Sequence, residues 1–407
     1  MMLSPSFGLE SLRMKIAING CGIAGPTLAW WLQRYGHEPV LFDESPALRT
    51  GGYVIDFWGT GYDIADKMGL LPGLKEDAYF IQHVRTVTAG GRTTSSLNTR
   101  AFHDMTNGRY MSIARSDLAR QIYQACDGIE TQFGTSVTDI EDQADKVAVR
   151  LSDGGQEAYD LVVGADGLHS HIRALAFGPQ EQFENHIGFY VAAFILPGYY
   201  PRDELTYVSH TKPGRQISRV ALRDDQTLFL FVFSKSFVTQ QPVGEAAEKA
   251  LLREIYCDMG WEAGAILSRI DEVSDVYFDR VSQIKMPVWT KGHVALVGDA
   301  AACVSLLAGE GTGLAMTEAY VLAGELHEAG NDHMTAFQAY QERLQPYLAR
   351  KQDAALKFAG LFAPKNWFWL VVRDALMNLT SIPLLGKQLL AGSFKSDLDL
   401  PMYAETQ

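Results

Sequence analysis

The stretch from residue 15 to residue 43 constrains the fold of this chain more than any other. A short apolar run leads directly into the glycine-rich motif GCGIAG at 20–25, and the spacing of apolar side chains predicts a helix over 27–35. A second apolar run over 39–42 then ends at Asp43. A strand, G-x-G-x-x-G, a helix, a strand and an acid in this order form the arrangement that binds a dinucleotide.

The three glycines of this motif have separate expected tasks. Gly20 permits the tight turn after the strand, Gly22 lets the backbone approach a pyrophosphate, and Gly25 lets the helix pack closely on the strand. The free N–H groups at the helix N-terminus attract phosphate, and Asp43 is placed to bind ribose hydroxyls. A glycine-rich turn that binds nothing is the alternative, which the flanking strand, helix and acid disfavour.

The composition excludes several classes of protein. The chain has 407 residues, is 47% hydrophobic and 20% charged, and carries a net charge of −13, which disfavours nucleic acid or an anionic membrane as a partner. Its four cysteines form no C-x-x-C pair, so we expect a reducing cytoplasm, no disulfide scaffold and no metal site. We expect no membrane span and no signal peptide, and residues 1–13 are interpreted as an extension before the fold.

Two more strand-to-turn motifs lie far from the first. Residues 161–165 form an apolar run that leads into Asp166-Gly167, and residues 294–297 form another that leads into Gly298-Asp299. A glycine-rich loop, AGEGTG at 308–313, then opens a strongly apolar helix. Each motif alone is common, but the three in this order are specific.

Together these motifs resemble the class A flavoprotein monooxygenases, the aromatic hydroxylase family typified by para-hydroxybenzoate hydroxylase. The likeness covers residues 15 to about 330. Over residues 284–326 the chain is most similar to the branch that contains the tetracycline-inactivating flavoenzymes and antibiotic-pathway oxygenases. The resemblance implies FAD as the bound cofactor, NAD(P)H as a transient reductant and O₂ as a co-substrate.

The same resemblance implies an α/β fold with interleaved parts. A Rossmann-like, glutathione-reductase-like FAD-binding domain is expected over 14–75, 105–177 and 285–350. A substrate domain built on a mixed or antiparallel β-sheet is expected over 76–104 and 178–284, where short β-rich runs alternate with Gly, Pro and Asp. A C-terminal helical region is expected over 351–407. Its segment 367–390 is interpreted as a surface helix, with a membrane-touching amphipathic helix as the alternative.

The resemblance also implies which residues bind the cofactor. Arg115 matches the arginine on the flavin side of FAD, Asp166 the aspartate near the pyrophosphate, and Asp299 the aspartate on the ribityl chain. The loop over 309–313 is expected beside the pyrimidine edge of the flavin, where helix N–H groups stabilise negative charge. The full set of expected cofactor-binding residues is Gly20, Gly22, Ile23, Ala24, Gly25, Asp43, Glu44, Gly52, Arg115, Asp166, Gly298, Asp299, Gly309, Gly311, Thr312 and Gly313.

The expected substrate contacts are aromatic side chains of the 178–284 sheet. Tyr190, Phe194 and Phe231 are predicted to face a flat substrate, and ordinary sheet core is the alternative for each. Leu306 is predicted to contact the substrate and stands where relatives carry a loop proline beside the reactive face of the flavin. No catalytic side chain is assigned, because the resemblance implies chemistry at the flavin C4a position.

These observations predict an FAD-dependent monooxygenase, a hydroxylase that oxygenates an aromatic or polycyclic small molecule such as an antibiotic or polyketide. It is expected to be cytoplasmic and a monomer or weak homodimer. Two alternatives stay open. One is another FAD reaction on this fold, a reductase or oxidase. The other is a non-catalytic flavin protein that sequesters a ligand, which the missing loop proline favours.

Overall fold

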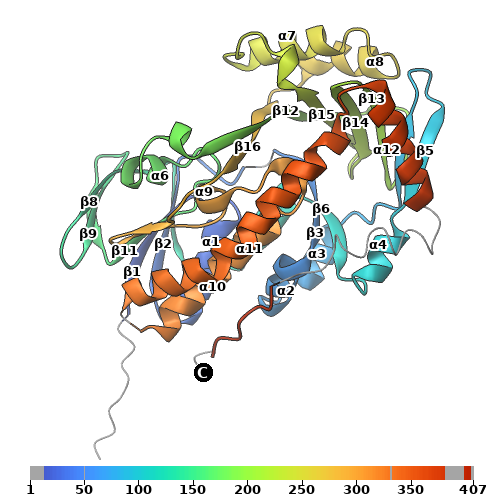
Figure 1. Ribbon diagram of the computed structural model, residues 1–407. Helices are drawn as coiled ribbons and strands as arrows, with labels where there is room; N and C mark the ends of the chain where they lie inside the picture. Colours follow the sequence, from blue (N-terminus) through green and yellow to red (C-terminus); the bar gives the residue numbers. More distant parts are fainter. Residues whose placement is uncertain (1–12, 50, 331, 381–397, 405–407) are drawn as a thin grey trace, which may run out of the picture.

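The computed structural model describes residues 13–49, 51–330, 332–380 and 398–404. Figure 1 shows two main layers, a lower body built on a largely parallel sheet and an upper body built on a larger antiparallel sheet. The long helix α11 (His333–Phe362) runs from the lower body to the upper one.

The lower body is a six-stranded sheet in the order β17-β18-β11-β1-β2-β7. All neighbouring strands pair in parallel except β17 with β18. The central strands are apolar on both faces, as expected for a parallel sheet covered by helices. The strands are β1 (Lys15–Asn19), β2 (Glu38–Asp43), β7 (Glu130–Phe133), β11 (Leu161–Gly164), β17 (Thr290–Lys291) and β18 (Val294–Leu296).

Helices cover this sheet and a small satellite sheet extends it. The buried helix α1 (Ala24–Arg34) packs against α10 (Gly311–Glu328), whose residues from 314 to 326 are all buried. The satellite sheet has the order β10-β9-β8. Its strands are β8 (Val137–Asp142), β9 (Val147–Leu151) and β10 (Gln156–Tyr159), and the other helices of the lower body are α2 (Gly59–Lys67), α3 (Leu71–Asp77), α5 (Arg115–Gln124), α6 (His171–Ala176) and α9 (Asp299–Ala302).

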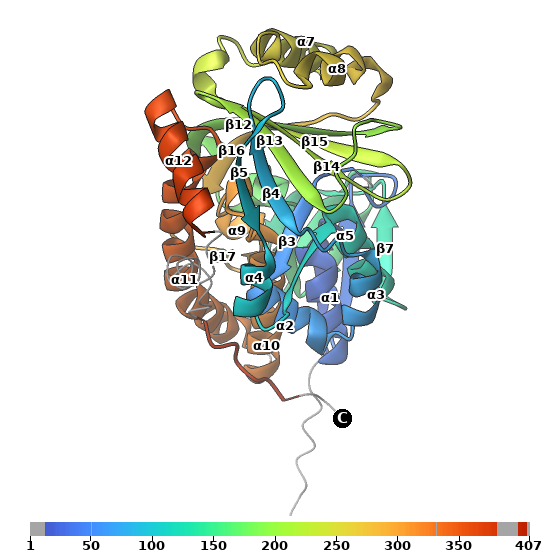
Figure 2. The ribbon, with the colours of Figure 1, turned by 90° about the vertical axis from the view of Figure 1, so that its right-hand side faces the viewer.

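The upper body is a seven-stranded sheet in the order β16-β12-β15-β14-β13-β4-β5, antiparallel except for the β13–β4 pair. Helices α7 (Glu245–Tyr256) and α8 (Ala263–Ser268) cover its outer face, and the lower body lies under its inner face, as Figure 2 shows. The strands are β4 (His83–Val87), β5 (Thr93–Asn98), β12 (Glu184–Pro197), β13 (Thr206–Lys212), β14 (Arg215–Ala221), β15 (Gln226–Ser234) and β16 (Tyr277–Ile284).

A two-stranded sheet of β3 (Val54–Trp58) and β6 (Tyr110–Ala114) lies between the two bodies. Short helix α4 (Arg100–Met105) follows β5. The prediction of an α/β fold with an FAD-binding-type sheet, a mixed sheet and C-terminal helices is confirmed.

The C-terminal helices connect both bodies. Helix α12 (Trp367–Thr380) packs on β5, where Thr94 Oγ1 donates to Asp374 at 2.9 Å and Asn378 Nδ2 donates to the Thr94 carbonyl at 3.1 Å. The predicted boundary at residue 351 falls inside the continuous helix α11. The part of the predicted tail helix over 381–390 lies outside the described residues, and among the described helices none is both long and apolar enough to cross a bilayer.

Candidate cofactor and active site

The fingerprint turn between β1 and α1 is held by very close backbone contacts. Gly20 has φ +117°, and a Cβ there would lie 2.4 Å from the Ala165 carbonyl oxygen. A Cβ on Gly25 would lie 1.9 Å from the Gly20 carbonyl oxygen. A Cβ on Gly22 would point into the cavity instead, with only Arg115 Nη2 near it at 3.7 Å. Gly20 and Gly25 therefore shape the turn, and Gly22 keeps its surface open to a ligand.

Asp43 closes this turn from the end of β2. Its Oδ2 accepts from the Cys21 N–H at 2.7 Å and its Oδ1 accepts from the Ser45 N–H at 2.9 Å. Each carboxylate oxygen has a second lone pair, so Asp43 can still accept a ribose hydroxyl. The neighbouring Glu44 lines the same cavity and pairs with Arg49 at 3.0 Å on the exposed rim.

Asp166 organises the second turn by accepting four hydrogen bonds. Its carboxylate accepts from Ser170 Oγ at 2.5 Å, from the His171 and Ile172 N–H groups at 2.8 and 3.0 Å, and from Asn19 Nδ2 at 3.2 Å. It therefore fixes the start of α6 and ties that start to β1. Its contact with a cofactor would be limited to its remaining lone pairs.

Arg173 joins the turn at Asp166 to the turn at Asp299, and no role was predicted for this residue from the sequence. The side chain is fully buried and donates to the Leu168 carbonyl at 2.6 Å and to the Ala300 carbonyl at 3.0 Å. The available signal was a charged residue one position after the buried Ile172 in the first turn of α6. A buried guanidinium needs several acceptors, and here carbonyls of both turns supply them.

Asp299 begins α9 at the third turn. Gly298 has φ +65°, and its N–H donates to Glu318 Oε2 at 2.8 Å, which fixes the turn from α10. Asp299 lines the cavity, and its burial raises the pKa of the carboxyl while the nearby Arg115 opposes that rise. Across the described residues the Arg115 guanidinium makes no hydrogen bond or ion pair, so it has free donors for a ligand.

The glycine-rich loop lines the same cavity as Ile55 of β3. Ser305 has the unusual φ of +140°, and Ser305 Oγ accepts from the Leu307 N–H at 3.2 Å in the turn over 306–308. Leu306, Gly309, Gly311 and Thr312 line the cavity. The first turn of α10 therefore presents unpaired N–H groups near it.

Two tyrosines, Tyr53 and Tyr277, face this loop and were not foreseen from the sequence. Their ring centroids are 5.7 Å apart, and both rings line the cavity with Ile55 and Leu306. Burial raises the pKa of Tyr53 to about 12 and raises that of Tyr277 as well, so both phenols stay protonated. Tyr53 precedes β3 and Tyr277 begins β16, so only the tertiary fold brings them together. We call them the tyrosine pair.

The cavity is lined by most of the predicted cofactor-binding residues and by Leu306, which was predicted to contact the substrate. The predicted residues that line it are Gly20, Gly22, Ile23, Ala24, Asp43, Glu44, Arg115, Asp166, Asp299, Leu306, Gly309, Gly311 and Thr312. The other four predicted cofactor-binding residues, all glycines, do not line the cavity but contact residues close to it. Gly25 packs on Gly20, Gly52 lies beside Arg115, Gly298 bonds to Glu318, and Gly313 packs on Gly61.

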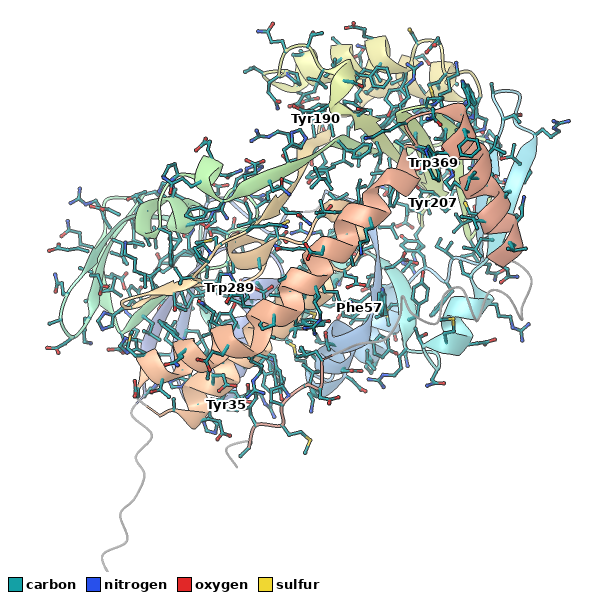
Figure 3. The ribbon with its side chains drawn as sticks, in the orientation of Figure 1. Tyr35, Phe57, Tyr190, Tyr207, Trp289 and Trp369 are labelled. Atoms are coloured by element: carbon teal, nitrogen blue, oxygen red, sulfur yellow. The ribbon has the colours of Figure 1, made fainter. Side chains whose placement is uncertain are left out.

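The three aromatic residues predicted to contact the substrate lie elsewhere. Tyr190, Phe194 and Phe231 are buried in the layer formed with α7 and α8, and Figure 3 shows Tyr190 below α7. The residues between them, such as Val191 and Ala193, face the lower body. The predicted substrate contacts are therefore corrected: the rings belong to the outer core, because helices α7 and α8 cover the face on which they lie.

The shape and chemistry of the cavity fit FAD. An open glycine surface at an α-helix N-terminus, the Arg115 guanidinium with its free donors and the Asp43 carboxylate line one part of the cavity. A second helix N-terminus and the tyrosine pair line another part. The cavity is lined by residues of the dinucleotide-type parallel sheet and of strand β16 of the large antiparallel sheet.

Comparisons with known proteins agree. The chain matches the family described as FAD binding domain over residues 13–356. It is 36% identical over 353 residues to a flavin-dependent monooxygenase of an unknown prokaryotic organism, covering 87% of this chain and 91% of that protein. It is 33% identical over 362 residues to a flavin-dependent monooxygenase of Legionella longbeachae serogroup 1 (strain NSW150), covering 88% and 91%. The chain belongs to the FAD-dependent monooxygenases.

Solved structures show the same relationship. The crystal structure of the tetracycline destructase Tet(51) has a TM-score of 0.82 and 30% identity, covering 96% of this chain and 100% of that chain. Klebsiella pneumoniae HpxO, solved with FAD and uric acid, shares the fold with a TM-score of 0.76 and 19% identity, covering 93% and 95%. The protein is thus an enzyme that uses FAD, with NAD(P)H as reductant and O₂ as co-substrate.

Proposed function

We propose that this monooxygenase oxygenates a flat aromatic or polycyclic small molecule, with antibiotics and polyketides as the first classes to test. The observation that supports this most is the tyrosine pair, which lines the same cavity as the glycine loop at 309–312. Aromatic side chains favour flat, apolar ligands. The similarity to Tet(51), a tetracycline destructase, favours the same substrate class.

In this proposal the cavity residues divide into a holding half and a reacting half. The N-terminus of α1 would bind the pyrophosphate, Asp43 would bind the adenosine ribose, and Arg115 would contact FAD on its flavin side. Asp299 would bind the ribityl chain. When bound, FAD supplies the electron and oxygen-transfer chemistry. The N-terminus of α10 would stabilise negative charge at the reacting end, while the tyrosine pair and Leu306 exclude water from it.

The proposal extends to the organisation of the protein. The lower body would be the FAD-binding domain and the seven-stranded sheet with its inner face the substrate domain, within the sequence ranges given above. We further propose a cytoplasmic enzyme that works as a monomer or weak homodimer. The four cysteines support the cytoplasmic location, since all of them are free thiols in this fold and three of them are buried.

The test is NAD(P)H oxidation by the purified FAD-loaded protein across a panel of phenols, polyketides and tetracyclines, with mass spectrometry of each product. We expect at least one flat substrate to accelerate NAD(P)H oxidation and to gain one oxygen atom. Hydrogen peroxide as the only product with every substrate would favour a reductase or oxidase instead. Tight binding without turnover would favour a ligand-sequestering protein.

A further inference from the structure

Two neighbouring residues of α11 hold the two ends of the loop that lies beside the reacting half of the cavity. Gln352 Nε2 donates to the Cys303 carbonyl at 3.1 Å and to the Ile284 carbonyl at 2.7 Å. Lys351 Nζ lies 2.7 Å from Glu310 Oε2 at the other end of the loop. The loop that carries Leu306 is therefore attached to α11 at its start by hydrogen bonds and at its end by an ion pair.

The ion pair is well shielded from solvent. The Lys351 side chain is 17% exposed and the Glu310 side chain 20%. Lys351 Nζ also lies 5.6 Å from the ring centroids of Trp58 and Tyr347, which places the cation against two aromatic faces. These four residues line a small cavity of about 20 Å³ that is separate from the main one. Charges in such a place are screened much less than those on the surface.

Glu310 occupies an electrostatically sensitive position. It is the last residue before α10, yet its side chain makes no capping hydrogen bond to that helix. Its neighbours Gly309, Gly311 and Thr312 line the main cavity. An uncompensated carboxylate there would oppose the positive N-terminus of α10 and would repel negative charge on a reduced cofactor in the cavity.

We propose that Lys351 is a positioning residue for the flavin reaction: by pairing with Glu310 it cancels a negative charge beside the reacting half of the cavity and keeps the reduced, anionic flavin stable. The inference rests on the placement of the flavin in the proposed function. It assigns the ion pair an effect on the reduction potential, beyond its effect on the shape of the loop.

The experiment measures the two-electron midpoint potential of bound FAD against a reference dye in Lys351→Met, Glu310→Gln and the double variant. We expect Lys351→Met to disfavour reduction about tenfold, a fall of about 30 mV for a two-electron couple. Glu310→Gln leaves an unpaired cation and should raise the potential. The double variant should return toward the wild-type value, and Lys351→Arg should match the wild type because it keeps the charge.

The directions in which the single variants shift the midpoint potential distinguish an electrostatic effect from a simple loosening of the loop. If both single variants shift the potential in the same direction, or neither shifts it, the inference is overturned. Should Lys351→Met fail to retain FAD, Glu310→Gln alone still decides, since only a rise in potential agrees with the inference. Asp353→Asn is the matched control, because it removes an exposed carboxylate from the same helix and should leave the potential unchanged.

FAD binding and substrate oxygenation by the wild-type protein test the proposed function, whereas the potentials of the variants test the role of Lys351. A wild-type protein that binds FAD and oxygenates a substrate supports the proposed function whatever the variants show. A wild-type protein that holds no FAD, or reduces it without oxygenating anything, contradicts the proposed function before any variant is compared.

Discussion

The two ends of the cavity are built in different ways. The end at Gly20–Asp43 is formed by one continuous stretch in which a strand, a turn, a helix and an acid follow each other in sequence. The other end combines Tyr53, the loop over 305–313 and Tyr277, which come from three distant parts of the chain. The first end identifies the cofactor from local sequence, whereas the second depends on how the two sheets meet.

The two faces of the seven-stranded sheet also differ in what they contact. Its inner face contributes to the reacting end, and its outer face packs on α7 and α8. The variants below test whether these faces and ends have different roles, and they are ordered from the largest expected effect to the smallest.

Phe231→Ala should give the largest effect, a loss of about 3–5 kcal/mol in the free energy of unfolding, because a fully buried ring is replaced by a cavity. Chemical denaturation of the FAD-loaded protein measures this loss. Leu306→Ala is the control, since its partly buried side chain faces the main cavity and should cost far less. A Phe231→Ala protein of wild-type stability with a raised KM would place this ring at the substrate after all.

Gly22→Val should weaken FAD binding at least about 100-fold, or about 2.7 kcal/mol, because the branched side chain would fill the surface where the pyrophosphate approaches. The melting temperature of the FAD-free protein should stay near that of the wild type, since this Cβ points into the cavity and its nearest neighbour, Arg115 Nη2 at 3.7 Å, is at ordinary contact distance. Flavin absorbance after desalting is the measurement. Gly90→Ala, in a turn with no atom near its Cβ, is the control, and a yellow Gly22→Val protein would refute the assigned role.

Tyr277→Leu should raise the KM of an aromatic substrate about threefold to tenfold, since aromatic pairs contribute about 0.5–1.5 kcal/mol beyond the area they bury. Tyr277→Phe keeps the ring and should stay close to the wild type. Steady-state kinetics with the best substrate of the panel gives the comparison. Loss of FAD affinity in the leucine variant, with an unchanged KM, would move Tyr277 from the substrate side to the cofactor side.

The smallest expected effect concerns His169, whose hydrogen bond with Asp279 at 3.0 Å raises the pKa of the imidazole despite partial burial. Because the folded-state pKa is raised, the stabilisation is complete below about pH 6.5 and is lost as the pH rises through the folded-state pKa.

His169→Gln should therefore cost about 0.5 kcal/mol at pH 5.5, the value of a solvent-screened pair, and almost nothing at pH 9. Denaturation midpoints at the two pH values measure the difference. A cost that is equal at both, or larger at pH 9, would show that the ion pair does not act as described.

The sequence was sufficient for the features that depend on neighbours in the chain. Gly20 and Gly25 make the close backbone contacts that their spacing predicts, and Gly22 keeps its surface open as the predicted pyrophosphate site requires. The turns at Asp166 and Asp299 were also recognisable, since each follows a buried strand directly.

The sequence was not sufficient for features that depend on which face of an element is covered. Residues 189–196 of β12 are apolar at every position, so their alternation does not show which side chains meet α7 and which meet the cavity. The tyrosine pair depends on the meeting of β3 and β16, more than 200 residues apart. The role of Arg173 depends on carbonyl groups of two separate turns.

The most direct measurement is a crystal structure of the protein with FAD and a turned-over substrate bound. We expect the pyrophosphate over Gly22 and the N-terminus of α1, the flavin ring beside the loop at 309–312, and the substrate against the tyrosine pair on the inner face of the sheet. A flavin ring at the Asp43 end, or a substrate among Tyr190, Phe194 and Phe231, would contradict the division between a holding end and a reacting end.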